Sequence, residues 1–144
     1  MATACVENGN YVDVSASYSA LYLCSNHQII KRYTVALGRG GTDKHVVGDA
    51  RTPIGQYRLG APHASERFFI FIPIGYPTRE QAKAGYTGEN VGVHGPINYL
   101  DWLYGANTWV NWTNGCIAVG SEDEINEIAG WVHSHQISKI VIRP

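Results

Sequence analysis

Short apolar segments separated by turns constrain the fold of this 144-residue chain more than any other feature. In the longest of them, alternation places Tyr33, Val35 and Leu37 on one face, as in a half-buried strand. Sixteen Gly and nine Tyr against a single Met also favour strands and turns over a helical bundle. The segments expected to form strands are 11–14, 21–24, 29–37, 56–59, 68–74, 90–94 and 139–143.

One stretch has clear helical periodicity, and it begins at Ser121. The spacing of Ser121 and Glu124 predicts a capping box at its start. One apolar face follows at helical spacing, and we expect it to pack into the core. That face consists of Ile125, Ile128, Ala129 and Val132.

Shorter irregular elements are expected in the middle of the chain. Thr78 and Gln81 are spaced as a second capping box, and Gly85 ends this short helix. Residues 98–104 are expected to form a further helical turn. Pro73, inside the apolar run 68–74, predicts a buried strand with a sheet edge or a bulge near the proline.

The whole chain is expected to form one domain, residues 1–144. The net charge is −1 and no cluster of Lys or Arg occurs, which disfavours nucleic-acid binding. No run of about 20 apolar residues is present, so no membrane span is expected. The first residues lack the basic and apolar regions of a signal peptide, so no signal is expected within this chain.

Cys116 and His94 are the strongest candidates for chemistry. A thiol becomes a nucleophile when a neighbour lowers its pKa or removes its proton, and an imidazole does both. Each residue adjoins a strand-like segment, and such pairs are usually distant in sequence. A lone Cys or His is more often a core residue, so the assignment depends on the residues around both.

Two further cysteines, Cys5 and Cys24, leave an odd total of three. They are either paired in a disulfide or two buried free thiols, because spacing alone does not fix pairing. A disulfide would argue for an oxidising compartment.

The runs Val91 to Pro96 and Thr113 to Ala118 resemble the signature of the L,D-transpeptidase (YkuD-type) family. That signature is a His-Gly, an interval, and then Ser/Thr-His-Gly-Cys followed by an aliphatic residue. The opening strands, the element 52–57 and the helix after Ser121 also resemble the family in the same order. Most of the chain is covered.

The resemblance implies a mainly β fold, a YkuD-like β-sandwich of mixed sheets with two or three short helices. It implies L,D-transpeptidation of peptidoglycan stem peptides in the bacterial envelope, periplasmic or otherwise extracytoplasmic, through a thioester. Cys116 is then the nucleophile, His94 the general base and the Gly95 carbonyl the group that orients the imidazole. A carbapenem is expected to acylate the same thiol. The alternatives are an L,D-carboxypeptidase or endopeptidase acting on stem peptides or wall-protein links, and a catalytically silent wall-binding module.

Substrate-binding residues are expected around the pair. Acyl transfer develops an oxyanion that needs fixed donors, and the amides of Gly115 and Cys116 are candidates. The candidate substrate contacts are Thr113, Asn114, Tyr76 and Arg79, with further cations at Arg39, Lys44 and Arg67. An aromatic-rich segment, Tyr99, Trp102, Tyr104, Trp109 and Trp112, is expected to belong partly to the core and partly to a lid.

Two positions depart from the family pattern. Asn114 replaces the His before Gly-Cys, and Ala118 replaces the usual Arg after it. Asn still donates a hydrogen bond but carries no charge, and Ala removes an anchor for a substrate carboxylate. These departures leave the nucleophile in place and make the acceptor substrate the open question.

Neither a cofactor nor a metal is expected. His133 and His135 faintly resemble part of a zinc peptidase site. Such a site also needs an upstream His and Asp, and His45 and Asp49 are of these residue types. The spacing of that family is missing, so a solvated helix end is the better interpretation of His133 and His135.

Overall fold

The computed structural model describes residues 4–97, 108 and 111–144. Within them nine strands form one continuous mixed sheet with the order β4-β9-β1-β2-β3-β8-β7-β6-β5. The strands are β1 (Asn10–Ser15), β2 (Ala20–Ser25), β3 (Gln28–Ala36), β4 (Gly55–Arg58), β5 (His63–Ser65), β6 (Phe69–Pro73), β7 (Gly92–His94), β8 (Ile117–Val119) and β9 (Lys139–Arg143). The expectation of a mainly β fold with mixed pairing is confirmed.

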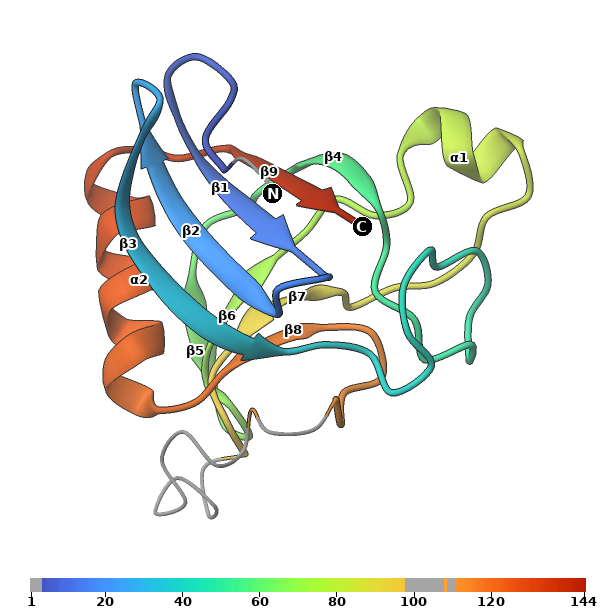
Figure 1. Ribbon diagram of the computed structural model, residues 1–144. Helices are drawn as coiled ribbons and strands as arrows, with labels where there is room; N and C mark the ends of the chain where they lie inside the picture. The colour runs from blue at the N-terminus through green and yellow to red at the C-terminus, as the bar shows by residue number, and fades with distance from the viewer. Residues whose placement is uncertain (1–3, 98–107, 109–110) are drawn as a thin grey trace.

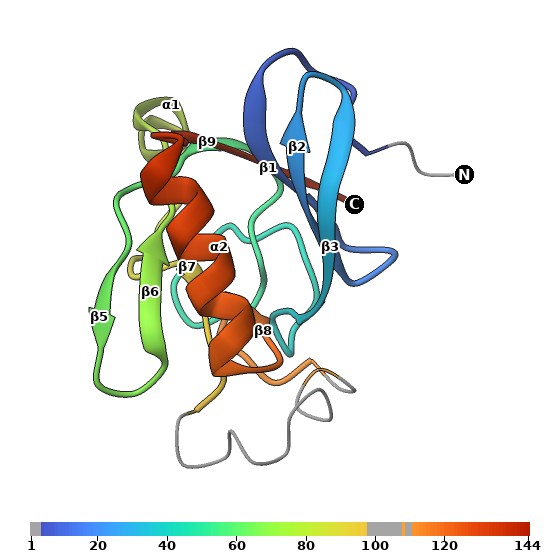
Figure 2. The same cartoon turned by 90° about the vertical axis from the view of Figure 1, so that its left-hand side faces the viewer.

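The sheet curls so that its two halves enclose the helix α2 (Glu122–Ser134) (Figure 1). We call β9-β1-β2-β3 the scaffold wall. We call β8-β7-β6-β5 the catalytic wall, after the candidate catalytic residue His94 that it carries. Figure 2 shows α2 in the opening between them, with β5 and β6 on one side and β1 to β3 on the other. The long strand β3 joins the walls, because it pairs with β2 along its length and with β8 at its end.

The apolar faces predicted from the sequence form the core. Tyr33, Val35 and Leu37 are buried in one cluster with residues of β1, β2, β9 and the catalytic wall. The α2 face meets the same cluster through Ile125, Ile128, Ala129 and Val132. Burial of these side chains supplies the main driving force for closing the sheet around the helix.

The start of α2 differs in one detail from the expected capping box. Ser121 Oγ accepts a hydrogen bond from the Glu124 amide at 3.3 Å, as predicted. The Glu124 carboxylate, however, accepts from the Ser121 hydroxyl at 3.2 Å. A hydrogen bond between the Ser121 and Glu124 side chains therefore accompanies the cap. The carboxylate also interacts favourably with the helix dipole at this N-terminal end. Within the described residues, neither helix has the length and apolarity needed to cross a membrane.

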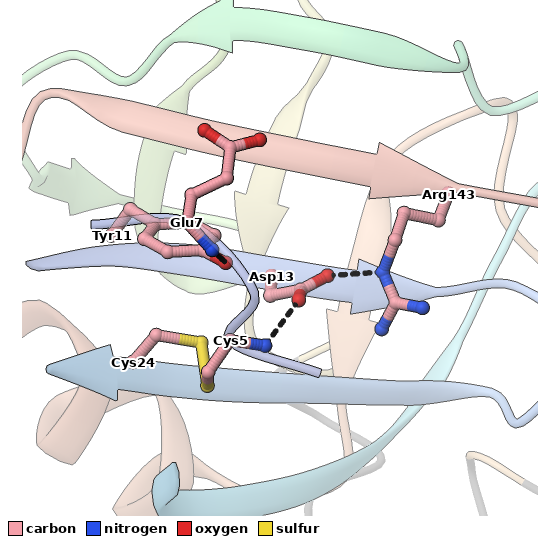
Figure 3. The surroundings of a disulfide bond; sticks show 6 residues. All are labelled: Cys5, Glu7, Tyr11, Asp13, Cys24 and Arg143. Carbon is pink, nitrogen blue, oxygen red and sulfur yellow. Dashed lines mark hydrogen bonds and ion pairs between the residues drawn. A yellow bond between two sulfur atoms is a disulfide. The ribbon is translucent and has the colours of Figure 1, made fainter. Parts of the chain in front are cut away.

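Cys5 and Cys24 form a disulfide, which settles the alternative that the sequence left open. The bond ties the segment before β1 to the end of β2 (Figure 3). Beside it the buried Asp13 carboxylate accepts from the Cys5 amide at 2.9 Å and from Arg143 Nε at 2.6 Å. The segment before β1 is thus fixed to the scaffold wall by a covalent bond and by a buried charged group that is hydrogen-bonded on both oxygens.

The middle of the chain corrects two expectations. Pro73 lies at the end of β6, which pairs with β5 and β7 and is therefore not an edge. Proline has no N–H to donate, and β5 pairs only with Phe69 to Phe71, so Pro73 lies beyond the β5 ladder. The edge strand on this side of the sheet is β5, which the sequence did not indicate. Most of β6 is only partly buried, because this wall is open on one face.

The short helix α1 (Arg79–Lys83) has the expected capping box between Thr78 and Gln81, and Gly85 follows with φ 98°. The helical turn expected at 98–104 lies outside the described residues.

Candidate active site

The register of two short strands brings Cys116 and His94 to one face of the sheet. β7 and β8 are parallel neighbours, with Val93 opposite Ile117 and His94 opposite Ala118. Val93 and Ile117 belong to the core, so the alternate residues project to the other face. Cys116 lies two residues before Ala118 and therefore projects to the same face as His94.

Both residues line a cavity of about 670 Å³. Its floor is the end of β7 and the loop before β8, and its sides come from the loops 39–50 and 88–91 and from Arg67 and Phe68. Thr113, Asn114 and Trp112 also line it. Of the aromatic segment expected near the site, Trp112 is thus at the cavity, while Tyr99, Trp102, Tyr104 and Trp109 lie outside the described residues.

His94 is held as a neutral base with a defined tautomer. It is 2 % exposed, and its Nδ1 lies 2.6 Å from the Gly95 carbonyl oxygen. A carbonyl only accepts, so Nδ1 carries the hydrogen and Nε2 carries the lone pair. Burial lowers the pKa of His94 to about 4; the bond to Gly95 opposes this shift, and the nearby charge of Arg67 adds to it.

The Cys116 thiol is protonated at rest. Its Sγ donates to the main-chain oxygen of Asn90 at 3.3 Å. Burial raises the pKa of the thiol, although a main-chain hydrogen bond at Gly92 and the charge of Lys44 act in the opposite direction. A neutral thiol and a neutral imidazole that line one cavity are suited to proton transfer between them rather than to a preformed ion pair.

Thr113 shapes the loop that presents the thiol. Its hydroxyl donates to the Cys116 carbonyl at 2.7 Å and accepts from the Gly115 amide at 3.1 Å. Gly115 has φ 132°, and a Cβ there would lie 2.7 Å from the Arg51 carbonyl oxygen, so glycine is required. The Gly115 amide is consequently used inside the loop, contrary to the expectation that it would face the developing charge.

A family model for the L,D-transpeptidase catalytic domain, YkuD, matches residues 9–142. The chain belongs to the YkuD family. The resemblance expected from the sequence is therefore confirmed over nearly the whole chain. No curated protein matches the chain in sequence.

Solved structures with this fold agree with the family. The helical cell shape determining protein Pgp2 from Campylobacter jejuni has 20 % identity and a TM-score of 0.70, over 96 % of this chain and 48 % of that one. For Bd1075 from Bdellovibrio bacteriovorus the identity is 19 % and the TM-score 0.63, over 94 % and 48 %. L,D-transpeptidase 3 from Mycobacterium tuberculosis, in complex with a faropenem-derived adduct, has 13 % identity and a TM-score of 0.59, over 94 % and 60 %. The chain thus spans about half the length of the first two structures.

A buried ion pair borders the cavity of this YkuD domain. Lys44 is 5 % exposed; its Nζ lies 2.9 Å from Asp49 Oδ1 and donates to the Val46 carbonyl at 3.1 Å. Burial opposes ionisation of Asp49, but hydrogen bonds from the amides of His45, Val46 and Arg51 and from Lys44 outweigh it, so its pKa lies well below its usual value. The loop is therefore organised around a charged carboxylate, and Lys44 brings a cation to the cavity wall.

Two expected substrate contacts lie away from the cavity. Tyr76 is buried, with 5 % exposure, and its hydroxyl donates to the carbonyls of Lys44 (3.3 Å) and Thr87 (3.0 Å). It supports the Lys44 loop from behind and does not line the cavity. Arg79 is exposed on α1 and likewise does not line the cavity. The structure therefore does not bring Tyr76 and Arg79 to the cavity of Cys116 and His94, because a nearby position in sequence does not show which wall a side chain faces.

The structure adds residues that the sequence did not single out. The Asn90 carbonyl binds the thiol, and the Phe68 ring stacks on the imidazole of His94 at 3.9 Å. A main-chain acceptor leaves no side-chain signal, and Phe68 is one apolar residue among several in its run.

His133 and His135 lie exposed at the end of α2, as expected for a solvated helix end. Among the described residues, no group of three or more His, Cys, Asp or Glu is arranged to hold a metal ion.

Proposed function

We propose that this YkuD domain transfers an acyl group of a peptidoglycan stem peptide to Cys116, with His94 as general base. The placement of both side chains on one face of β7 and the segment before β8, inside a single cavity, carries the proposal. The hydrogen bond from Nδ1 to Gly95 supports it, because that bond leaves the lone pair on Nε2 for the thiol proton.

The first half-reaction follows from this geometry. Nε2 of His94 takes the proton from Cys116 Sγ as the sulfur attacks the carbonyl carbon of the third stem residue. The C–N bond to the terminal D-amino acid then breaks, and the leaving amine takes the proton from His94. The product is a thioester on Cys116, and His94 is neutral again.

The oxyanion formed in this step needs donors, which we assign to the Cys116 amide and to the Asn114 side chain. Asn114 is exposed and lines the cavity, and its amide group donates without carrying charge. The Gly115 amide is excluded because it already donates to Thr113.

Cations on the cavity wall replace the Arg that the family pattern has after the nucleophile. Ala118 at that position is completely buried, so it offers nothing to a substrate carboxylate. Arg39, Lys44 and Arg67 line the cavity, opposed there by Glu89. We propose that Arg39 and Arg67, which are exposed, hold the carboxylates of the stem peptide.

The second half-reaction is proposed to be transfer to an amine of another stem peptide, which completes L,D-transpeptidation. Attack by water on the same thioester would make the domain an L,D-carboxypeptidase or endopeptidase. We place the reaction outside the cytoplasm. The Cys5–Cys24 disulfide supports this location, because disulfides persist in oxidising compartments.

The test is incubation of the protein with purified tetrapeptide muropeptides, with and without an acceptor stem peptide, followed by mass spectrometry. Transpeptidation predicts cross-linked dimers, whereas hydrolysis predicts tripeptide monomers. Cys116→Ala is the control, and it should form neither. Absence of both products with wild type would favour a silent wall-binding module.

A carbapenem provides an independent test of the acyl site. Its strained amide carbonyl is expected to take the place of the stem-peptide carbonyl and to be opened by the Cys116 thiolate. Intact-protein mass spectrometry should find the adduct on wild type and not on Cys116→Ala. An adduct on both proteins would contradict the assignment of Cys116.

A further inference from the structure

The turn between β5 and β6 lies directly against the catalytic imidazole. The Phe68 ring and the His94 ring are stacked, with centroids 3.9 Å apart and an interplanar angle of 20°. Phe71, the cross-strand partner of His94, is also nearly parallel to it but lies 6.3 Å away. Phe68 is therefore the ring in direct contact with the imidazole.

The main chain of Phe68 is bonded to the residue that orients the imidazole. The Phe68 carbonyl accepts from the Gly95 amide at 3.1 Å and from the Ile70 amide at 2.8 Å. Phe69, between them, has φ 68°, which is rare for a residue with a side chain and must be held by its surroundings. The Gly95 carbonyl, in turn, takes the hydrogen of His94 Nδ1.

We propose that Phe68 is a positioning residue for His94: its ring fixes the plane of the imidazole while its carbonyl fixes the Gly95 peptide that selects the tautomer. These two contacts of Phe68 thus fix both the orientation of the imidazole ring and which of its nitrogens carries the hydrogen. This proposal rests on the proposed role of His94 and adds a residue whose part is to position the imidazole, although Phe68 also lines the cavity.

Stacking is required because the hydrogen bond alone leaves the ring free to tilt about the Nδ1–oxygen direction. A flat neighbour at 3.9 Å restricts that tilt and keeps water from the covered face. The Arg67 guanidinium lies over the Phe68 ring, 5.3 Å from its centroid, so a positive charge packs on the ring that covers His94. Exclusion of water and a nearby positive charge both disfavour the imidazolium, in agreement with the lowered pKa of His94.

Several charged or titratable groups share the cavity with His94, and each bears on its protonation. They are Arg39, Lys44, Arg67, Glu89 and Cys116. None of these residues is replaced in a Phe68 variant, but Arg67 packs on the Phe68 ring, so a shift in the titration of His94 in such a variant reports on stacking and burial together with any movement of Arg67.

The decisive measurement is the imidazole ¹H–¹⁵N spectrum of His94 as a function of pH, since it needs no turnover. Phe68→Leu keeps the main-chain carbonyl but removes the ring, so the imidazole should tilt, its Nδ1–H bond to Gly95 should weaken and the Nε2–H tautomer should become detectable. The titration midpoint should rise by about one pH unit or more. Phe68→Tyr, which keeps a flat ring, should behave like wild type. Phe71→Leu is the matched control from the same hairpin, and it should keep the single tautomer.

The kinetic expectation is a fall in kcat of about tenfold or more for Phe68→Leu, with KM changed much less, because the loss is in alignment rather than in binding. Phe68→Met replaces the Leu variant if that one does not fold. An unchanged tautomer and midpoint in a folded Leu or Met variant would overturn the proposal. Equal effects of Phe68→Leu and Phe71→Leu would also overturn it, since they would indicate general loosening of the hairpin. If wild type turns over no stem peptide, the spectra still decide this proposal while the proposed function fails.

Discussion

The two walls of the curled sheet are held in place by different kinds of contact. In the scaffold wall, β1 and β2 match over six residue pairs, and a disulfide joins the segment before β1 to β2. In the catalytic wall, β7 and β8 match over only two pairs. The short ladder is supplemented by close backbone contacts at Gly92, Gly95 and Gly115, where a Cβ would lie within 2.7 Å of a neighbouring atom.

This difference suggests that one wall mainly stabilises the fold, while the other mainly positions side chains. Long ladders and apolar burial stabilise the scaffold wall without requiring any one side chain to be in a unique orientation. The catalytic wall places His94 at the end of β7 and Cys116 just before β8. Single hydrogen bonds hold them, from the His94 ring to the Gly95 carbonyl and from the Thr113 hydroxyl to the Cys116 main-chain carbonyl. We therefore expect substitutions in the catalytic wall to affect activity and those in the scaffold wall to affect stability.

The largest effect is expected for Cys116→Ala. Removal of the thiol should lower stem-peptide turnover by about 10³-fold or more, because no other group forms the thioester. The melting temperature should change little, since the thiol is only partly buried and its hydrogen bonds are to main-chain groups. The double variant with His94→Ala should be no worse than either single variant, as for two parts of one unit. Substantial turnover by a folded Cys116→Ala protein would contradict the role of Cys116 and the expectation that activity depends on the catalytic wall.

Acid should disable the catalytic wall through His94. With a pKa of about 4 in the fold and an ordinary value of 6.5, the acid limb of kcat/KM should have its midpoint near pH 4. The unfolded chain binds more protons between these values, so stability should fall as the pH drops from 6.5 to 4. The difference corresponds to about 3 kcal/mol.

The control for the acid prediction compares two histidines. His94→Gln should reduce the loss of unfolding free energy between pH 6.5 and pH 4, as measured by urea titration. His63→Gln, at an exposed position on β5, should leave that loss unchanged. An activity limb near pH 6.5 would show that His94 has an ordinary pKa.

The disulfide tests the scaffold wall alone. Replacement of Cys5 and Cys24 by Ala should lower the free energy of unfolding by about 3 kcal/mol, the amount expected for closing a loop of this length. Turnover below the new melting temperature should remain within about twofold of wild type, because the bond lies in the other wall. Denaturant unfolding and the muropeptide assay measure the two quantities. A large loss of turnover in the folded variant would show that the walls are coupled.

A pair of glycines gives the smallest and most specific comparison. Gly95→Ala would place Cβ 2.7 Å from the Phe68 carbonyl oxygen and 3.0 Å from Ile125 Cγ2, so we expect destabilisation by about 1–3 kcal/mol and reduced turnover. Gly130→Ala, on α2 with no atom within 4 Å, should instead stabilise by about 0.5–1 kcal/mol. Thermal melts of both variants measure the effects. If both variants changed the stability in the same direction, the close contact at Gly95 would be relaxed by a small backbone shift.

Local patterns in the sequence determined most of the fold. All the strands except β5 and β8, the apolar face of α2 and the Thr78 cap follow from periodicity and from hydrogen bonds within a few residues, so the chain itself specifies them. The His-Gly and Asn-Gly-Cys motifs pointed to the family and to Cys116 and His94 as the proposed catalytic pair for the same reason, since each motif is local.

Contacts between distant residues were decided only by the tertiary structure. The sequence left the pairing of Cys5 with Cys24 open and placed Tyr76 in the cavity rather than behind the Lys44 loop. It also gave no sign that Phe68 covers His94 or that the Asn90 carbonyl binds the thiol. Strand register sets these contacts, and register depends on how the whole sheet closes around α2, whereas a periodic pattern reports only which face of its own element a side chain occupies.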